Sequence, residues 1–312
     1  MSPPPIAPVQ PARWPELAPT AAWADTLATL HRWVQIIGKI RMEKTPLVNH
    51  WWNVPLYVTP RGLTTSPIPH RGHRFQIDLD LLDHRLHVTS SWGEARAFAL
   101  EPMSVAAFYR RLFGALEELG IDARIWTLPV EIADPVVPFP DDEAHAAYDA
   151  DAVARFWRAL LQADRVFSDF RARFLGKVSP VHFFWGAFDL AVSRFSGREA
   201  PPHPGGAPHL GAWVMEEAYS HEVSSAGFWP GGEIGEAAFY AYAYPAPDGF
   251  EASAVEPEAA AYHAGLGEFI LPYEAVRTAG DPDAALLAFL QTPYAAAADL
   301  ADWDRRALER DA

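Results

Sequence analysis

The chain has 312 residues, of which half are hydrophobic and twelve are tryptophan, so it holds enough apolar surface for a large core. Its formal charge of −15 and its pI near 5.2 disfavour nucleic acid and anionic membranes as partners, because both require a basic face. The chain has no cysteine, which excludes thiolate chemistry and suits the reducing cytoplasm that we predict as its location. No apolar run approaches the length of a membrane-spanning helix, so no membrane association is expected.

The first half of the chain predicts one helix, four strands and a second helix. Residues 1–12 are rich in proline and are expected to form a disordered arm. Leu27, Leu30, Val34 and Ile37 recur at helical spacing, which predicts a helix near 20–43. Further segments follow in order: strands near 50–59, 73–80, 85–91 and 95–100, and a helix near 104–119 that ends at Gly120.

The second half repeats this order after a proline-rich and acidic linker at 129–150. The expected elements are a helix near 152–175, strands near 181–193, 219–228 and 236–244, and a last helix near 284–300. Residues 245–282 are interpreted as an insertion with one short strand at 268–271.

These patterns predict an α+β protein built from two α-β-β-β-β-α units with mainly antiparallel sheets, packed as a pseudo-twofold body. The units are expected to span residues 13–128 and 151–312, and the second unit carries the candidate site. An internal repeat supports this division. Residues 31–72 align without gaps on residues 164–205 at a shift of 133, with eight identities where composition predicts roughly three.

The two copies of this repeat differ where strand alternation predicts a buried face. Asp189 occupies the position of Leu56, and Glu222 occupies the position of Val88. Further along, Tyr240 and Tyr242 replace two apolar residues, Phe98 and Leu100. Unpartnered carboxyl and phenol groups are costly to bury, so such a cluster is expected to line a wet pocket or to form a paired network.

The preferred interpretation is a pocket in which Asp189 and Glu222 act as acid and base while Tyr240 and Tyr242 orient a substrate. One alternative is a structural network in which arginine or tyrosine partners satisfy the two acids. Another is an error of one residue in the strand register, which a bulge at Gly186 would produce and which would turn both acids to solvent.

Basic and aromatic residues near this strand complete the expected ligand site. Arg194 and Arg198 suit a carboxylate or phosphate group. The alternative for Arg194 is an architectural role, since Arg61 matches it in the first half, and the alternative for Arg198 is an ordinary ion pair. The remaining candidates for ligand binding are aromatic or imidazole side chains: Trp185, His203 and Trp229. No nucleophile elbow, Walker loop or dinucleotide fingerprint occurs, and no cofactor is expected.

The twelve histidines show no recognised metal-ligand spacing. A zinc or iron site remains an alternative if histidines that are distant in the sequence lie close together in the fold. Its candidate ligands are His182, His203 and His221.

Several longer motifs resemble an uncharacterised bacterial family that is known only as a domain of unknown function. The segments that carry the resemblance are Trp14-Pro-Glu-Leu17, Gly176-Lys-Val-Ser-Pro-Val-His-Phe-Phe-Trp-Gly186 and Gly227-Phe-Trp-Pro-Gly-Gly232. The resemblance covers nearly the whole chain beyond residue 12. It implies a bacterial protein but carries over no activity, cofactor or catalytic residue.

Taken together, these patterns favour an enzyme that performs acid–base chemistry on a small polar or anionic metabolite. A non-catalytic sensor with the same pocket is one alternative, and a metal-dependent hydrolase or oxygenase is another. The sequence leaves the substrate and the oligomeric state open.

Overall fold

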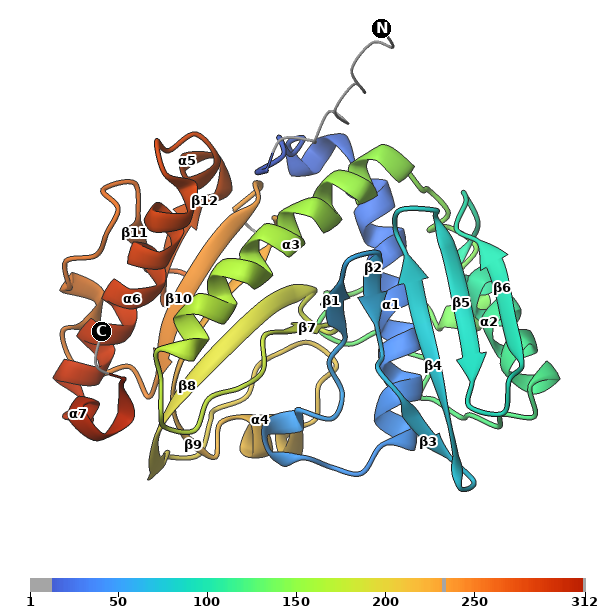
Figure 1. Cartoon of the computed structure of the whole chain (residues 1–312), viewed down its shortest axis with the longest axis horizontal. Coiled ribbons are helices and arrows are strands. Elements are labelled where there is room, and N and C mark those ends of the chain that lie inside the picture. The colour runs from blue at the N-terminus through green and yellow to red at the C-terminus, as the bar shows by residue number, and fades with distance from the viewer. Residues whose placement is uncertain (1–12, 232–233, 311–312) are drawn as a thin grey trace, which may run out of the picture.

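The computed structural model describes residues 13–231 and 234–310, so the predicted arm at 1–12 lies outside the described residues. Within the described ranges the chain forms seven α-helices and two antiparallel sheets of six strands each (Figure 1). The α+β class predicted from the sequence is confirmed. None of the helices in these ranges combines the length and the apolarity needed to cross a bilayer.

The first sheet belongs to the first half of the chain and has the strand order β1-β2-β4-β5-β6, with β3 paired to β4. The clearest predicted strand, β4, alternates as expected, because Phe75, Ile77 and Leu79 are buried on one face. The elements of this half are η1 (Thr20–Ala22), α1 (Ala24–Lys44), η2 (Asn49–Trp51), β1 (Tyr57–Thr59), β2 (Gly62–Thr64), β3 (Ile68–His70), β4 (His73–Asp80), β5 (Arg85–Ser90), β6 (Ala95–Ala99) and α2 (Val105–Glu118).

The second sheet has the order β11-β12-β10-β9-β8-β7, and α3 lies across it with α6 beside it (Figure 1). Three of its inner strands, β8, β9 and β10, are long, and β10 alternates alanine with aromatic residues from Tyr240 onward. The elements are η3 (Phe139–Asp141), α3 (Ala150–Ala172), β7 (His182–Phe184), β8 (Asp189–Glu199), α4 (Ala212–Ala218), β9 (His221–Trp229), β10 (Ala238–Tyr244), η4 (Phe250–Ala252), β11 (Ala261–His263), β12 (Glu268–Pro272), α5 (Tyr273–Arg277), α6 (Pro282–Leu300) and α7 (Arg305–Leu308).

Two predicted strands are interrupted by tight turns. The segment 50–59 is strand only from Tyr57 onward, because His50 and Trp51 adopt left-handed backbone angles within η2. The segment 181–193 is divided into β7 and β8 by a turn at 185–188, where Phe188 is also left-handed. Both predictions of one continuous strand are therefore wrong at these turns.

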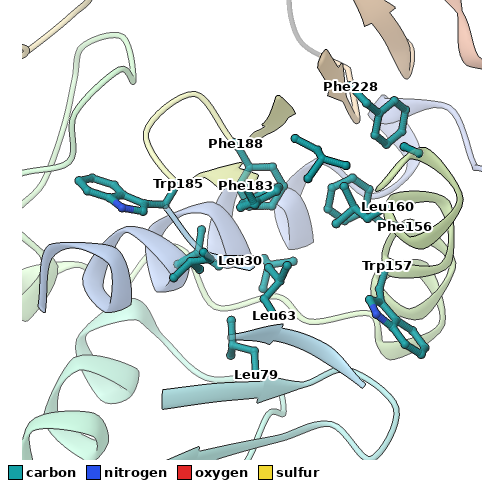
Figure 2. Close-up of a cluster of buried hydrophobic side chains, with 14 of the residues drawn as sticks. Leu30, Leu63, Leu79, Phe156, Trp157, Leu160, Phe183, Trp185, Phe188 and Phe228 are labelled. Carbon is teal, nitrogen blue, oxygen red and sulfur yellow. The ribbon is translucent and has the colours of Figure 1, made fainter. Parts of the chain in front are cut away.

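The two halves are joined by one backbone contact and by a shared core. Leu56 and Phe183 exchange two backbone hydrogen bonds of 2.8 and 2.7 Å, which link the beginning of β1 to β7. One cluster of buried side chains continues through both halves. Figure 2 shows Leu63 and Leu79 of the first sheet near Leu30 of α1, with Phe156 and Leu160 of α3 in the same cluster.

The two halves share the order of a long helix, an antiparallel sheet and a closing helix, but the proposed gapless register does not hold. The helices α1 and α3 begin 126 residues apart (150 − 24) and end 128 apart (172 − 44), whereas the repeat alignment requires 133. At a shift of 133, β1 and β2 also both fall within the single strand β8. Internal duplication itself stays a prediction.

The predicted linker at 129–150 packs against α1. The side-chain amide of Gln35 in α1 forms two hydrogen bonds with the backbone of Val130. The amide nitrogen donates to the Val130 carbonyl at 2.7 Å, and the amide oxygen accepts from Val130 N at 2.9 Å. Arg32 lies 3.3 Å from the buried carboxylate of Asp142. These contacts fix the position of the neighbouring residue, Glu131.

Candidate functional site

A cavity of about 610 Å³ lies against one face of the second sheet, while α3 and α6 pack on the other face. Opposite the sheet, its walls come from α1 and from the segments 50–54, 124–131 and 207–219. The strand register decides which residues line it. Gly227 on β9 is paired with Tyr240 on β10 and with Ala191 on β8, and Tyr240 and Ala191 both line the cavity. A volume of this size suits a small organic molecule.

Asp189 at the beginning of β8 is the most deeply buried acid of the cavity, with 5% of its surface exposed. Its Oδ2 accepts a hydrogen bond from the Tyr240 hydroxyl. Its Oδ1 has no hydrogen-bond partner among the described residues. Burial raises the pKa of Asp189 to about 6, although the Tyr240 hydrogen bond acts in the opposite direction. One carboxylate oxygen is therefore anchored and the other is left for a bound molecule.

Tyr240 reaches Asp189 because the strand between them carries a glycine. The phenol ring lies over Gly227 of β9, at the place where a side chain would otherwise stand. Burial, followed by the charge of Asp189, raises the pKa of Tyr240 well above its ordinary value, so the phenol keeps its proton and donates it.

Two further carboxyl groups, those of Glu131 and Glu268, also line the cavity. Burial raises the pKa of Glu131 to about 7 and that of Glu268 to about 8, and the charge of Asp189 acts in the same direction on both. Glu131 holds a left-handed backbone with φ of 55°, and its carboxyl group occupies the space that a side chain at position 186 would need, which Gly186 leaves open. We refer to Glu131, Asp189 and Glu268 as the carboxyl cluster.

Aromatic side chains surround the carboxyl cluster. Trp229 stacks on Tyr240 with ring centroids 4.6 Å apart, and Tyr242 continues the row at 6.0 Å from Tyr240. The hydroxyls of Tyr219 and Tyr242 form a 2.8 Å hydrogen bond, and burial raises the pKa of Tyr219 to about 12. The indole nitrogen of Trp229 has no hydrogen-bond partner within the described part of the chain.

Trp185 closes the side of the cavity next to α1. Its indole lies against Gly38, where a larger residue would overlap the ring, and its nitrogen donates to the Val54 carbonyl at 3.0 Å. Trp185 is 7% exposed and lines the cavity.

A family model described as a family of unknown function, DUF5996, matches residues 14–310. The chain belongs to the DUF5996 family. This membership confirms the resemblance to a domain of unknown function that the sequence motifs indicated. No curated protein and no solved structure gives a significant match to the chain.

In this DUF5996 member Glu222 does not share the face of Asp189, contrary to the prediction. The register of β8 and β9 pairs Phe195 with Val223, and both residues line the cavity, so the neighbouring Glu222 points to the opposite face. There it lies 2.7 Å from Arg198 and accepts a 2.8 Å hydrogen bond from Ser196. The paired acids expected from the sequence are therefore not brought together.

The two arginines expected to bind an anion also lie away from the cavity. Arg194 is fully buried on the helix side of β8, where its guanidinium lies 3.4 Å from the ring centre of Phe170 and donates to the Phe170 carbonyl. Arg198 is exposed and donates to the Ala301 carbonyl at 2.5 Å, just beyond the end of α6. Both arginines bind the sheet to its helices.

The three histidines proposed as metal ligands are dispersed. His182 is buried in β7, and burial lowers its pKa to about 3. His203 stacks on Tyr219 at 4.3 Å, and His221 accepts or donates a 3.0 Å hydrogen bond with Ser220. Among the described residues no group of three or more metal-ligating side chains is placed to hold an ion.

Sequence reasoning missed Glu131, Glu268 and Tyr219. Glu131 falls in a proline-rich segment interpreted as a linker, where no periodicity indicates which way a side chain points. Glu268 begins the short strand predicted at 268–271, and the alternation of that strand does place Glu268 and Ile270 on one face. Only the pairing of β12 with β10 brings that face to the cavity.

Proposed function

We propose that this DUF5996 protein is an enzyme that performs acid–base chemistry on a small polar molecule held in the cavity beside the second sheet. The observation that carries the proposal is the carboxyl cluster, whose three members face one cavity with pKa values of about 6, 7 and 8. Carboxyl groups with such values exist in both protonation states near neutral pH, as general acid–base catalysis requires.

The roles within the cluster follow from the order of the pKa values. Asp189 has the lowest value and is held by Tyr240, so it is the proposed base, and its free Oδ1 is the atom that takes the proton. Glu268 has the highest value and is the proposed acid. Neighbouring carboxyl groups with separated pKa values commonly divide the two roles in this way.

Glu222, Arg194 and Arg198 have no part in this proposal, because their contacts lie on the other face of the sheet. The substrate is accordingly proposed to be polar without a required anionic group. We keep the bacterial cytoplasm as the predicted location.

The test compares the wild-type protein with Asp189→Asn, which preserves the shape of the side chain and removes the titrating group. A panel of polar metabolites would be screened both for binding, by thermal stabilisation, and for product formation, by mass spectrometry. The expected result is that Asp189→Asn still binds the substrate but loses product formation by about 100-fold or more. Glu222→Gln is the matched control and should retain full activity.

A ligand that stabilises the protein without any product would instead support the non-catalytic sensor. Equal turnover by the wild-type protein and Asp189→Asn would contradict the assignment of Asp189 as the base.

A further inference from the structure

We propose that the cavity takes an organic cation, namely a protonated primary or secondary amine attached to an apolar body. This inference deepens the proposed function and rests on it, because the same cavity is taken as the ligand site. It is carried by unpartnered acceptor atoms, by the positions of the basic groups and by the aromatic lining.

Two carboxyl oxygens in the cavity lack a hydrogen-bond partner. They are Oδ1 of Asp189 and Oε2 of Glu268, which are both buried and both without a partner among the described residues. A buried acceptor without a donor is costly, so a ligand that supplies N–H groups at this end of the cavity recovers that free energy. The two acids are close enough for the charge of Asp189 to act on Glu268.

Only two lysine or arginine side chains line the cavity within the described chain, and neither is placed to neutralise the cluster. The ammonium of Lys39 donates to the Leu128 carbonyl and, at 3.2 Å, to the Trp126 carbonyl. Arg124 is exposed to solvent at the mouth. No lysine or arginine among the described residues is therefore paired with the cluster, and a cationic ligand would supply the charge opposite to the Asp189 carboxylate.

The histidines of the cavity do not supply that charge either. His50 has its Nδ1 within 3.2 Å of two backbone carbonyl oxygens, and burial lowers its pKa, so the ring is neutral near pH 7. His209 lies 3.0 Å from the carboxylate of Asp134, which is not part of the carboxyl cluster.

The aromatic lining suits the apolar body of such an amine. Trp229, Tyr240 and Tyr242 form a row beside the cluster in which the rings stack on one another, so they add apolar surface next to the acceptor atoms. The remaining walls include Met42, Val54 and Leu210, which suit an apolar body next to the amine. A quaternary ammonium has no N–H to donate, so the two orphan acceptors select a primary or secondary amine.

The experiment uses the full chain and four probes of similar shape that differ in their polar group. They are 2-phenylethylamine, its N-trimethyl derivative, 2-phenylethanol and 3-phenylpropanoate. Dissociation constants would be measured by isothermal titration calorimetry at neutral pH. The amine is expected to bind about tenfold or more tightly than the alcohol and the trimethyl derivative, and the carboxylate is expected not to bind.

Two variants locate the effect. Asp189→Asn and Glu268→Gln should each weaken amine binding by about tenfold, whereas Glu222→Gln on the opposite face should leave it unchanged. Circular dichroism would show that each variant is folded.

Several results would overturn the inference. If the alcohol or the carboxylate binds as tightly as the amine, and Asp189→Asn reduces that binding, the cavity remains a ligand site and only the charge class is wrong. If amine binding is equally strong in Asp189→Asn, the amine does not use the cluster. If no probe binds at millimolar concentration, the amine assignment falls and the metabolite screen decides the proposed function separately.

Discussion

Three glycines determine how closely acidic and aromatic side chains approach the cavity. Gly227 makes room for the ring of Tyr240, Gly186 for the carboxyl group of Glu131, and Gly38 for the indole of Trp185. None of the three adopts left-handed backbone angles. Glycine is therefore needed at these positions because it has no side chain, and not because of its backbone conformation. A methyl group at any of them would overlap the side chain that now occupies the space.

The overlap at Gly227 can be tested with a double-mutant cycle. Gly227→Ala should lower the free energy of unfolding by about 1–3 kcal/mol, because the new methyl group displaces the Tyr240 ring. In a Tyr240→Ala background the same substitution should cost much less, since the ring is gone. Urea unfolding of the four proteins measures both effects. Equal costs in the two backgrounds would show that Tyr240 does not lie over Gly227.

At the scale of single elements, β8 separates a face that lines the cavity from a face that packs on helices. Asp189 and Ser193 face the cavity, while Arg194 faces the helices and is fully buried. The guanidinium of Arg194 is held between the rings of Phe170 and Tyr294, with its carbon 3.4 and 4.3 Å from their centres. One face of β8 therefore holds α3 and α6 through Arg194, while the other face lines the cavity.

Arg194 and Arg198 lie on the same strand and offer a matched comparison. Arg194→Ala should destabilise the protein by about 3 kcal/mol, because it removes three cation–π contacts and one of the two hydrogen bonds to the Phe170 carbonyl. Arg198→Ala should cost about 1 kcal/mol or less, since its ion pair with Glu222 is exposed. Chemical denaturation of both variants provides the measurement. A larger loss for Arg198→Ala would contradict this division of roles.

At the scale of the whole molecule, the carboxyl cluster is assembled from three distant parts of the chain. Glu131 comes from the segment between the halves, Asp189 from the beginning of β8 and Glu268 from the beginning of β12. Each is desolvated by packing that the other two segments help to provide, so folding raises all three pKa values.

This assembly predicts how stability depends on pH. Because the folded-state pKa values of about 7 and 8 for Glu131 and Glu268 exceed the unfolded value near 4.3, the folded protein binds more protons, and stability falls as pH rises from about 4 to about 8. Burial lowers the pKa of His31 to about 4 and that of His182 to about 3, which has the opposite effect. That effect ends near pH 6.5, the ordinary value of histidine.

Between about pH 6.5 and 8 the buried histidines no longer oppose the effect of the two glutamates. In this range the free energy of unfolding should decrease as pH rises. Glu268→Gln should flatten this decrease, while Glu222→Gln should leave it as in the wild-type protein. Urea unfolding at several pH values within this range gives the slopes. A wild-type slope of zero, or an unchanged slope in Glu268→Gln, would show that Glu268 does not titrate at a raised pKa.

The sequence alone was sufficient for elements whose signal is local. The helical spacing of Leu30, Val34 and Ile37 predicted α1, and the alternation around Phe75 predicted β4 with the same bounds as the structure. Periodicity succeeds here because the pattern of buried and exposed residues is set within one element. Strand alternation combined with the alignment of the two halves placed Asp189 and Tyr240 on a common face, and the two side chains are hydrogen bonded.

The tertiary structure decided which acids meet. Glu222 was assigned to the face of Asp189 by alignment of the two halves, but the actual register of β8 against β9 turns it to the other side. Glu131 and Glu268 lie 58 and 79 residues from Asp189 along the chain, and no pattern within their own segments shows that they meet it. Strand pairing and loop packing bring them together, and these depend on contacts between elements, which the pattern within any one segment does not encode.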